Sequence, residues 1–201
     1  MVPGTLSVQD SRGLTLWQAG GMARHIALLR GINLASRNRV PMGELREALG
    51  EAGFEDVATL LQSGNVVVTS GKAPRTVERE IAALVEDRFG VRAAVVVRSA
   101  TELEAVIEGN PFSAEAAKAP KNVHVIFLSA KPEAAAVRQL TDADLGDERV
   151  APDGKHVYAW FANGVQRSPL ARMLTDERLG VTATGRNWNT VLKLQALAER
   201  D

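Results

Sequence analysis

The two halves of this 201-residue chain show the same succession of β-strand and helix patterns. In each half, an apolar run typical of a strand is followed by a helical period, two β-rich runs, a second helical period and a last β-rich run. A βαββαβ unit of this kind folds into a mainly antiparallel sheet with helices on one face. We therefore predict an α+β fold with two ferredoxin-like βαββαβ halves that share a core, and an additional C-terminal helix.

Glycine and proline residues mark the boundaries of the expected elements. The strands expected in the first half are Arg24–Gly31, Val57–Leu61, Val66–Thr69 and Ala93–Arg98, with helices that begin at Pro41 and Pro74 and end at Gly53 and Gly90. The second half is expected to form the strands Val123–Ser129, Arg149–Ala151, Lys155–Ala162 and Val181–Thr184, and the helices Pro132–Leu140 and Leu170–Leu179.

Two further helices complete the expected set. Thr101–Glu108 links the halves, and Asn187–Arg200 ends the chain with Asn187 as its N-cap. The opening strands of the two halves align, His25–Leu29 with His124–Leu128, which is compatible with an internal duplication.

These patterns divide the chain into four segments. We expect residues 1–21 to be a flexible extension, 22–98 the first βαββαβ half, 99–120 a linking helix and loop, and 121–201 the second βαββαβ half with the C-terminal helix. Met1–Gly21 lacks the apolar period that would dock it on a core. Since a second methionine, Met22, directly precedes the first strand, a misassigned start or a cloning remnant are alternatives for this segment.

Charge and residue usage narrow the possible functions. The 24 basic and 24 acidic residues give no net charge, so the molecule lacks the overall positive field of a general nucleic-acid binder, while a local patch stays open. The absence of cysteine excludes disulfides, thiolate nucleophiles and cysteine-bound metals. His25, His124 and His156 lie far apart without metal-ligand spacing, and we expect neither a metal site nor a cofactor.

Membrane contact is also not expected from the sequence. No apolar run approaches the roughly 20 residues that cross a bilayer. The first residues have neither the basic start nor the apolar middle of a secretory signal. We therefore expect a cytoplasmic protein, and the sequence leaves its oligomeric state open.

Three arginines and two asparagines gather between the first strand and the first helix. They lie in Arg30–Pro41, where backbone amides and the dipole of the following helix also favour an anion. This segment is a candidate cradle for phosphate or carboxylate, with Arg30, Asn33, Arg37 and Arg39 as its contacts. The alternative is a solvated loop whose asparagines stabilise turns and whose arginines pair with surface carboxylates.

A second polar cluster, Gln62-Ser63-Gly64-Asn65, separates two strands. The primary amides of Gln62 and Asn65 belong to the side chains that bind amide or base edges bidentately. The structural alternative is a tight hairpin in which Gly64 and Asn65 tolerate positive φ. Ser63 has no histidine near it in the sequence to act as a base, which argues against a serine hydrolase.

A third polar cluster, Thr184–Thr190, precedes and opens the final helix. Its simplest interpretation makes Asn187 a helix cap and Trp188 a core anchor. In the alternative, Arg186 and Asn189 face a ligand and Trp188 supplies a stacking wall.

If the three clusters meet in space, they form one anion-binding cleft. We therefore interpret the chain as a binding protein for a small anionic or nucleotide-like ligand, or for a nucleic-acid end. Two alternatives stay open: an enzyme that acts on a phosphorylated substrate, with a carboxylate or bound magnesium doing the chemistry, and a protein-interaction module without a small ligand. The sequence does not decide whether the chain is an enzyme. The candidate contacts are Arg30, Asn33, Arg37, Arg39, Gln62, Ser63, Asn65, Arg186, Asn187 and Trp188.

Several of these segments together form a specific motif set. The motifs are Leu28–Asn33, Pro41-Met42, Gln62–Val66, Asn110–Phe112, Arg167-Ser168 and Thr184–Thr190. In this combination the chain resembles the bacterial domain of unknown function 1697 family, from about Ala23 to its C-terminus. The resemblance implies a two-part α+β fold and no established activity.

Two positions depart from the family pattern. Ala35 and Ser36 stand where relatives often have two glycines, which weakens the case for a glycine-rich phosphate nest. Pro169 stands where relatives often have a lysine. If that lysine contributes to a ligand site in relatives, this chain lacks the contribution.

Overall fold

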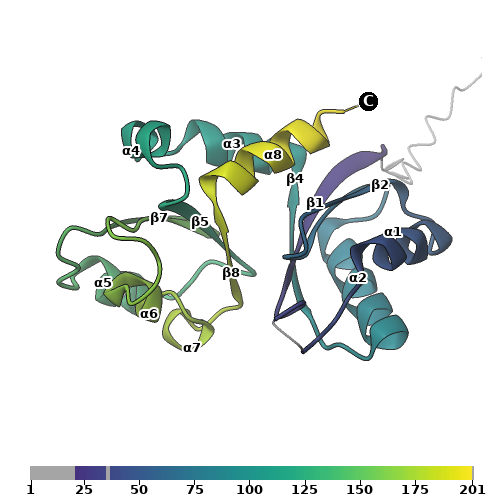
Figure 1. The fold of residues 1–201 in the computed structure, drawn as a ribbon, viewed down its shortest axis with the longest axis horizontal. Coiled ribbons are helices and arrows are strands. Elements are labelled where there is room, and N and C mark those ends of the chain that lie inside the picture. The colour runs from purple at the N-terminus through teal and green to yellow at the C-terminus, as the bar shows by residue number, and fades with distance from the viewer. Residues whose placement is uncertain (1–20, 35–36, 201) are drawn as a thin grey trace, which may run out of the picture.

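Two four-stranded antiparallel sheets with interleaved helices make up the computed structural model, which describes residues 21–34 and 37–200 (Figure 1). The α+β class, the two βαββαβ halves and the C-terminal helix are confirmed. The extension predicted for residues 1–21 falls almost wholly outside the described residues, as do Ala35 and Ser36. Within the described ranges, no helix is both long enough and apolar enough to span a bilayer.

The elements of the first half are β1 (Ala23–Arg30), α1 (Met42–Glu51), β2 (Glu55–Leu60), β3 (Asn65–Ser70), α2 (Pro74–Phe89) and β4 (Ala94–Ser99). Its sheet has the strand order β2-β3-β1-β4. The inner strand β1 is buried on both faces: Ala27 and Leu29 face the helices α1 and α2, whereas Ile26 and Leu28 face the second half.

The second sheet repeats this connectivity in the order β6-β7-β5-β8. Its elements are β5 (Val123–Leu128), α5 (Ala134–Thr141), β6 (Arg149–Asp153), β7 (His156–Trp160), α6 (Pro169–Met173), α7 (Asp176–Leu179) and β8 (Ala183–Asn187). The single helix predicted for Leu170–Leu179 is wrong, because Thr175 has extended backbone and separates two short helices. The last strand also runs three residues further than predicted, to Asn187.

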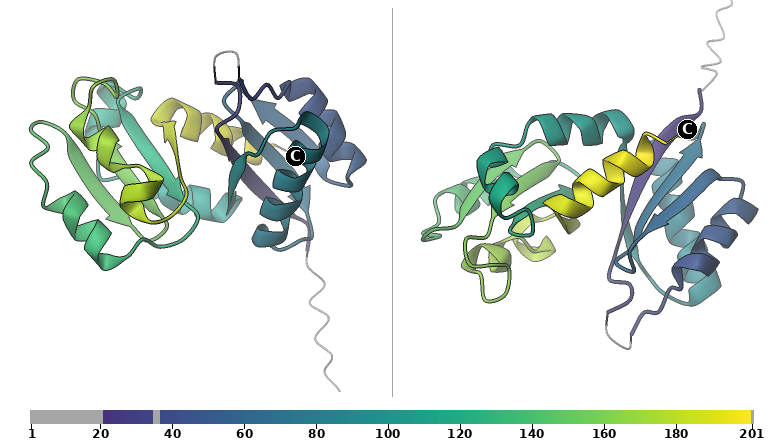
Figure 2. Two further views of the ribbon diagram at one scale, coloured as in Figure 1. Left: turned by 90° about the horizontal axis from the view of Figure 1, so that it is seen from below. Right: turned by 45° about the horizontal axis from the view of Figure 1, so that its top comes forward.

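A shared core joins the halves. The final helix α8 (Trp188–Ala198) packs against strands of both sheets, and the linking helices α3 (Ala100–Glu108) and α4 (Ser113–Lys118) contribute to the same core (Figure 2). The prediction of helices on one face only was therefore incomplete: both faces of each sheet are covered. The shared core includes Ile26, Leu28, Val67 and Val96 from the first sheet, Leu103, Val106, Val191 and Leu194 from the helices, and Val125, Phe127 and Tyr158 from the second sheet.

Each half closes with an arginine, a helix cap and a helix. Arg98 and Ser99 end β4, and the Ser99 hydroxyl accepts a hydrogen bond from the Glu102 amide at the start of α3. Arg186 and Asn187 end β8, and the Asn187 side chain accepts one from the Thr190 amide, which confirms the predicted cap of α8. These residues lie opposite the aligned opening strands in the same register, because Ser99 faces His25 and Asn187 faces His124. The match supports the internal duplication.

Candidate functional site

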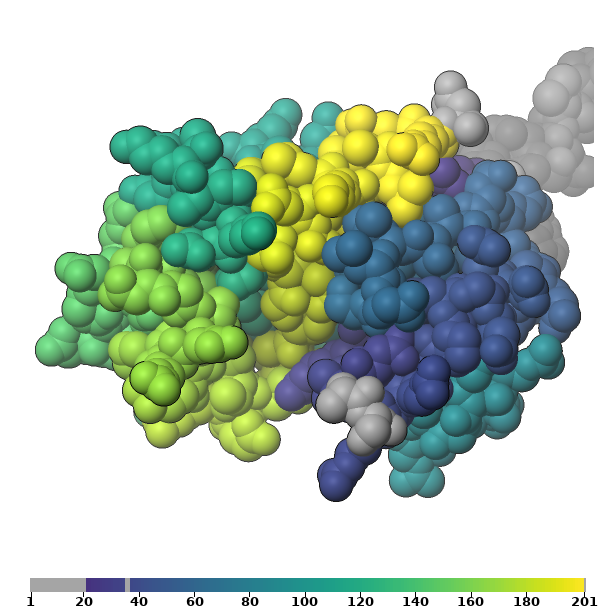
Figure 3. Space-filling view, in the orientation of Figure 1, coloured from purple at the N-terminus to yellow at the C-terminus, as the bar shows by residue number. Residues whose placement is uncertain are grey.

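The three polar clusters meet at a cleft between the halves, as the single-site hypothesis required. The cleft has a volume of about 390 Å³. Figure 3 shows the purple end of β1 and the loop after it against the yellow-green segment of the second half. We call this cleft the inter-half cleft. Its lining residues are Leu29, Arg30, Gly31, Ile32, Asn33, Leu34, Gln62, Ser63, Thr184 and Arg186.

Arg186 forms the floor of the inter-half cleft and is only 8% exposed. Its Nε donates to the Asn65 side chain, and one terminal nitrogen donates to Thr184 Oγ1 at 2.8 Å. The guanidinium also reaches four backbone carbonyls, those of Leu29, Ser63, Gly64 and Gly185. All of these acceptors are neutral, and burial lowers the pKa of Arg186 to about 10. The side chain therefore holds the halves together with a charge that no bonded carboxylate neutralises.

Arg98 of the first half makes the equivalent contact with the second half. It is buried in the first half and donates to the carbonyls of Leu128 and Lys155 in the second, at 2.6 and 2.7 Å. Leu128 holds the place that Leu29 holds in the first half, since their amides donate to Lys155 and Gly64 respectively. Each half thus sends the arginine of its last strand to the same two backbone positions of the other half. We call the two residues the reciprocal arginines.

The surroundings of the reciprocal arginines differ in charge. Arg98 lines a smaller cleft, of about 250 Å³, together with Glu102, Asp153, Lys155 and His156. Burial lowers the pKa of Arg98, while nearby Glu102 and Glu78 act in the opposite direction. The lining of the inter-half cleft includes no acidic residue among those described. Of the two clefts, only the one at Arg186 therefore has a positively charged lining without carboxylates.

Arg30 is the second cation of the inter-half cleft. It forms an ion pair across the halves with Asp176, a residue 146 positions away in the sequence. Asp176 uses its other carboxylate oxygen to accept a hydrogen bond from the Ala183 amide at 2.9 Å. Both side chains stay accessible, with exposed fractions of 40% for Arg30 and 32% for Asp176. Sequence reasoning did not single out Asp176, because no local signal marks so distant a partner.

Two asparagines predicted as ligand contacts form hydrogen bonds within the cleft walls. Asn33 exchanges hydrogen bonds with the backbone of Val40 and donates to the Gln62 carbonyl at 2.8 Å, which closes the loop after β1. Asn65 is buried, donates to the Leu60 carbonyl and Ser63 Oγ, and accepts from Arg186. Their amide groups are therefore engaged within the protein.

Gln62 and Ser63 are exposed and stand on the rim of the cleft. The turn that carries them has unusual backbone, with φ of 59° at Leu61 and 77° at Gly64. A Cβ at Gly64 would lie 2.8 Å from the Cβ of Leu29, so only glycine fits there. A bulky residue such as Leu61 rarely adopts positive φ, and such strain gathers at functional sites.

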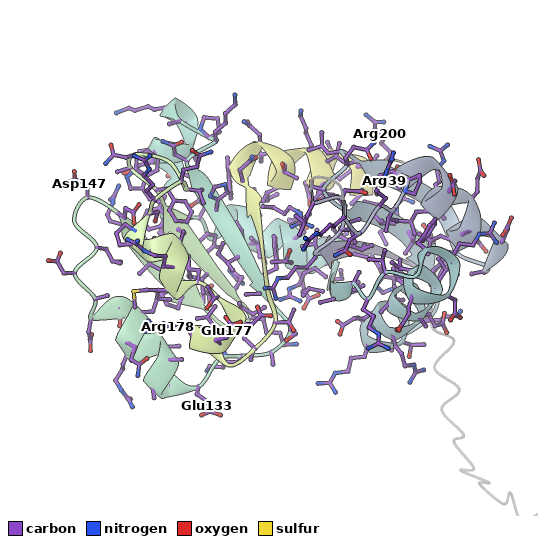
Figure 4. All side chains as sticks on the ribbon, turned by 60° about the horizontal axis from the view of Figure 1, so that its bottom comes forward. Arg39, Glu133, Asp147, Glu177, Arg178 and Arg200 are labelled. Atoms are coloured by element: carbon purple, nitrogen blue, oxygen red, sulfur yellow. The ribbon has the colours of Figure 1, made fainter. Side chains whose placement is uncertain are left out.

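Four other candidates lie outside the cleft lining. Arg37 and Arg39 are exposed, and Figure 4 shows Arg39 on the first half, well away from Glu177 of α7. Asn187 caps α8, and Trp188 is 8% exposed in the shared core, as the simplest interpretation of the third cluster predicts. Of the residues in the ligand-facing alternative, Arg186 lines the cleft, whereas Asn189 and Trp188 do not. In the described part of the chain, no group of three or more histidine, aspartate or glutamate residues is placed to hold a metal ion.

The fold and the cleft together define a protein of two α+β halves with a cationic cleft between them. The chain belongs to the family described as protein of unknown function (DUF1697), whose model matches residues 22–158. None of the curated proteins matches the chain. Among solved structures, a conserved bacterial protein, SP0830 from Streptococcus pneumoniae, is similar with a TM-score of 0.68 and 22% identity, over 89% of this chain and 99% of that one. This likeness supports the fold.

Proposed function

We propose that the protein binds a small anionic ligand in the inter-half cleft. The observation that carries the proposal is the buried, uncompensated charge of Arg186 on the cleft floor. A buried cation is costly unless an opposite charge approaches it, and a cleft with low-dielectric walls focuses its field on the space in front of it. An anion in the cleft supplies the missing countercharge.

The two arginines take different parts in this proposal. The N–H groups of Arg186 are engaged with acceptors in the protein, so this side chain contributes charge rather than new hydrogen bonds. Arg30 is more exposed and can present its planar fork to a carboxylate or phosphate. Gln62 and Ser63 add neutral polar groups at the rim.

The cleft at Arg98 serves as a comparison within the same molecule. Arg98 joins the halves as Arg186 does, yet carboxylates stand in its cleft. Joining the halves therefore does not require a lining without carboxylates, and the lack of acidic residues in the lining at Arg186 favours a ligand there. A volume of about 390 Å³ is at the small end of ligand pockets, which favours a small molecule over a nucleic-acid end.

A binding measurement on matched arginine variants tests the proposal. We expect methyl phosphate, titrated into the full chain by calorimetry, to bind the wild type and to bind Arg30→Met at least about tenfold more weakly, since a charge-assisted hydrogen bond is lost. Arg39→Met is the control, because Arg39 is an exposed arginine of the same loop outside the lining. Equal losses in both variants, or no binding to the wild type, would contradict the proposal.

A further inference from the structure

The more accessible arginine of the inter-half cleft, Arg30, is already paired with a carboxylate of the protein. Arg30 lines the cleft, and its Nη1 donates to Asp176 of the opposite half. Asp176 is held beside the cleft wall by the Ala183 amide, the residue before Thr184 of the lining. Any anion that binds Arg30 through its fork must therefore compete with Asp176.

We propose that Asp176 is a built-in competitor that weakens the binding of every anion to Arg30, so that dianions such as phosphate monoesters, rather than monoanions, bind strongly enough to displace it. This inference rests on the proposed function and deepens it by naming the ligand class. The contact of Asp176 with Arg30 is the one that the ligand replaces.

A dianion can overcome the competition from Asp176 because of its charge. A carboxylate on the same chain competes at a high effective concentration, because it loses no translational freedom on binding. A free monoanion brings the same charge and has no electrostatic advantage over it. A phosphate monoester brings close to two charges, which match the two cations of the lining, Arg30 and Arg186, and its three acceptor oxygens can receive hydrogen bonds from Arg30.

The local structure allows Asp176 to give way. About a third of its side chain is exposed, and α7 has only four residues. The bond from the Ala183 amide uses Oδ1, whereas Arg30 uses Oδ2, so the carboxylate can release Arg30 and keep its backbone partner. The exchange therefore needs no unfolding of β8.

A matched pair of ligands tests the inference without any variant. Methyl phosphate and methyl sulfate are both tetrahedral, but at pH 7.5 the first is mostly dianionic, with a second pKa of about 6, and the second is a monoanion. We expect calorimetry on the wild type to give at least about tenfold tighter binding of methyl phosphate, because the doubled charge faces two cations. Equal affinities would overturn the inference.

Asp176→Asn then tests the residue itself. Asparagine keeps an oxygen for the Ala183 amide and removes the competing charge, so both ligands should bind about fivefold tighter or more, and methyl phosphate should gain at least as much as methyl sulfate. Glu177→Gln, the adjacent exposed carboxylate, is the control and should leave both affinities within about twofold.

The outcomes separate the two proposals. If Asp176→Asn binds both ligands no better than the wild type, or if Glu177→Gln gives the same gain, the competitor role of Asp176 fails while anion binding stands. If the wild type binds neither ligand, the proposed function fails as well. Thermal melts of both variants confirm that the proteins titrated are folded.

Discussion

At the scale of single residues, Arg186 combines a structural role and an electrostatic one. Its hydrogen bonds reach the first half at the end of β1 and at the β2–β3 hairpin, which ties the cleft walls to the second half. None of its hydrogen-bond partners is a carboxylate, so its positive charge makes the electrostatic potential of the cleft positive. Substitutions of Arg186 therefore change both the free energy of unfolding and the affinity for an anion. A substitution of the more exposed Arg30 is expected to change mainly the affinity.

We expect Arg186→Met to lower the free energy of unfolding by about 3 kcal/mol or more, because buried acceptors from both halves lose their donor. Chemical denaturation of the full chain measures this loss. Arg98→Met, at the reciprocal position with fewer acceptors, should be destabilised less. A change within about 0.5 kcal/mol for Arg186→Met, the range usual for surface substitutions, would show that the arginine does not hold the halves together.

At the scale of elements, the sequence predicted most boundaries because local chemistry determines them. Pro41 and Pro74 precede or begin helices as expected, and Gly90 ends α2 with a φ of 67°. The break between α6 and α7 was not predictable from the apolar period, which continues through Leu174 and Leu179. Extended backbone at Thr175 interrupts the helix there.

A substitution of Asn187, the N-cap of α8, distinguishes a structural role from a role in ligand binding. We expect Asn187→Ala to lower the free energy of unfolding by about 1 kcal/mol, because the Thr190 amide loses its acceptor. The affinity for methyl phosphate should stay unchanged, since Asn187 is outside the cleft lining. Denaturation and calorimetry on the same preparation check both statements. A loss of affinity without a loss of stability would show that Asn187 contacts the ligand and would contradict its assignment as a helix cap only.

At the scale of the whole molecule, the fold is two similar halves joined face to face by the shared core and the reciprocal arginines. On the sequence alone we assume that the three polar clusters meet, because each concentrates arginine or primary amides, and the lining of the inter-half cleft contains residues of all three. The sequence could not show that the amides of Asn33 and Asn65 are used inside the protein, since their acceptors depend on how the chain closes. It also could not find Asp176 or Arg98, whose partners lie in the opposite half.

The most direct test of the central claim is a titration of methyl phosphate into the isotope-labelled full chain, followed by amide chemical shifts. We predict that the shifts concentrate on residues 29–34, 62–63, 184 and 186, which line the inter-half cleft. The amides around Arg98 and Lys155, in the second cleft, should move little. Shifts centred on that second cleft, or scattered over exposed lysines and arginines, would contradict the claim that the inter-half cleft is an anion site.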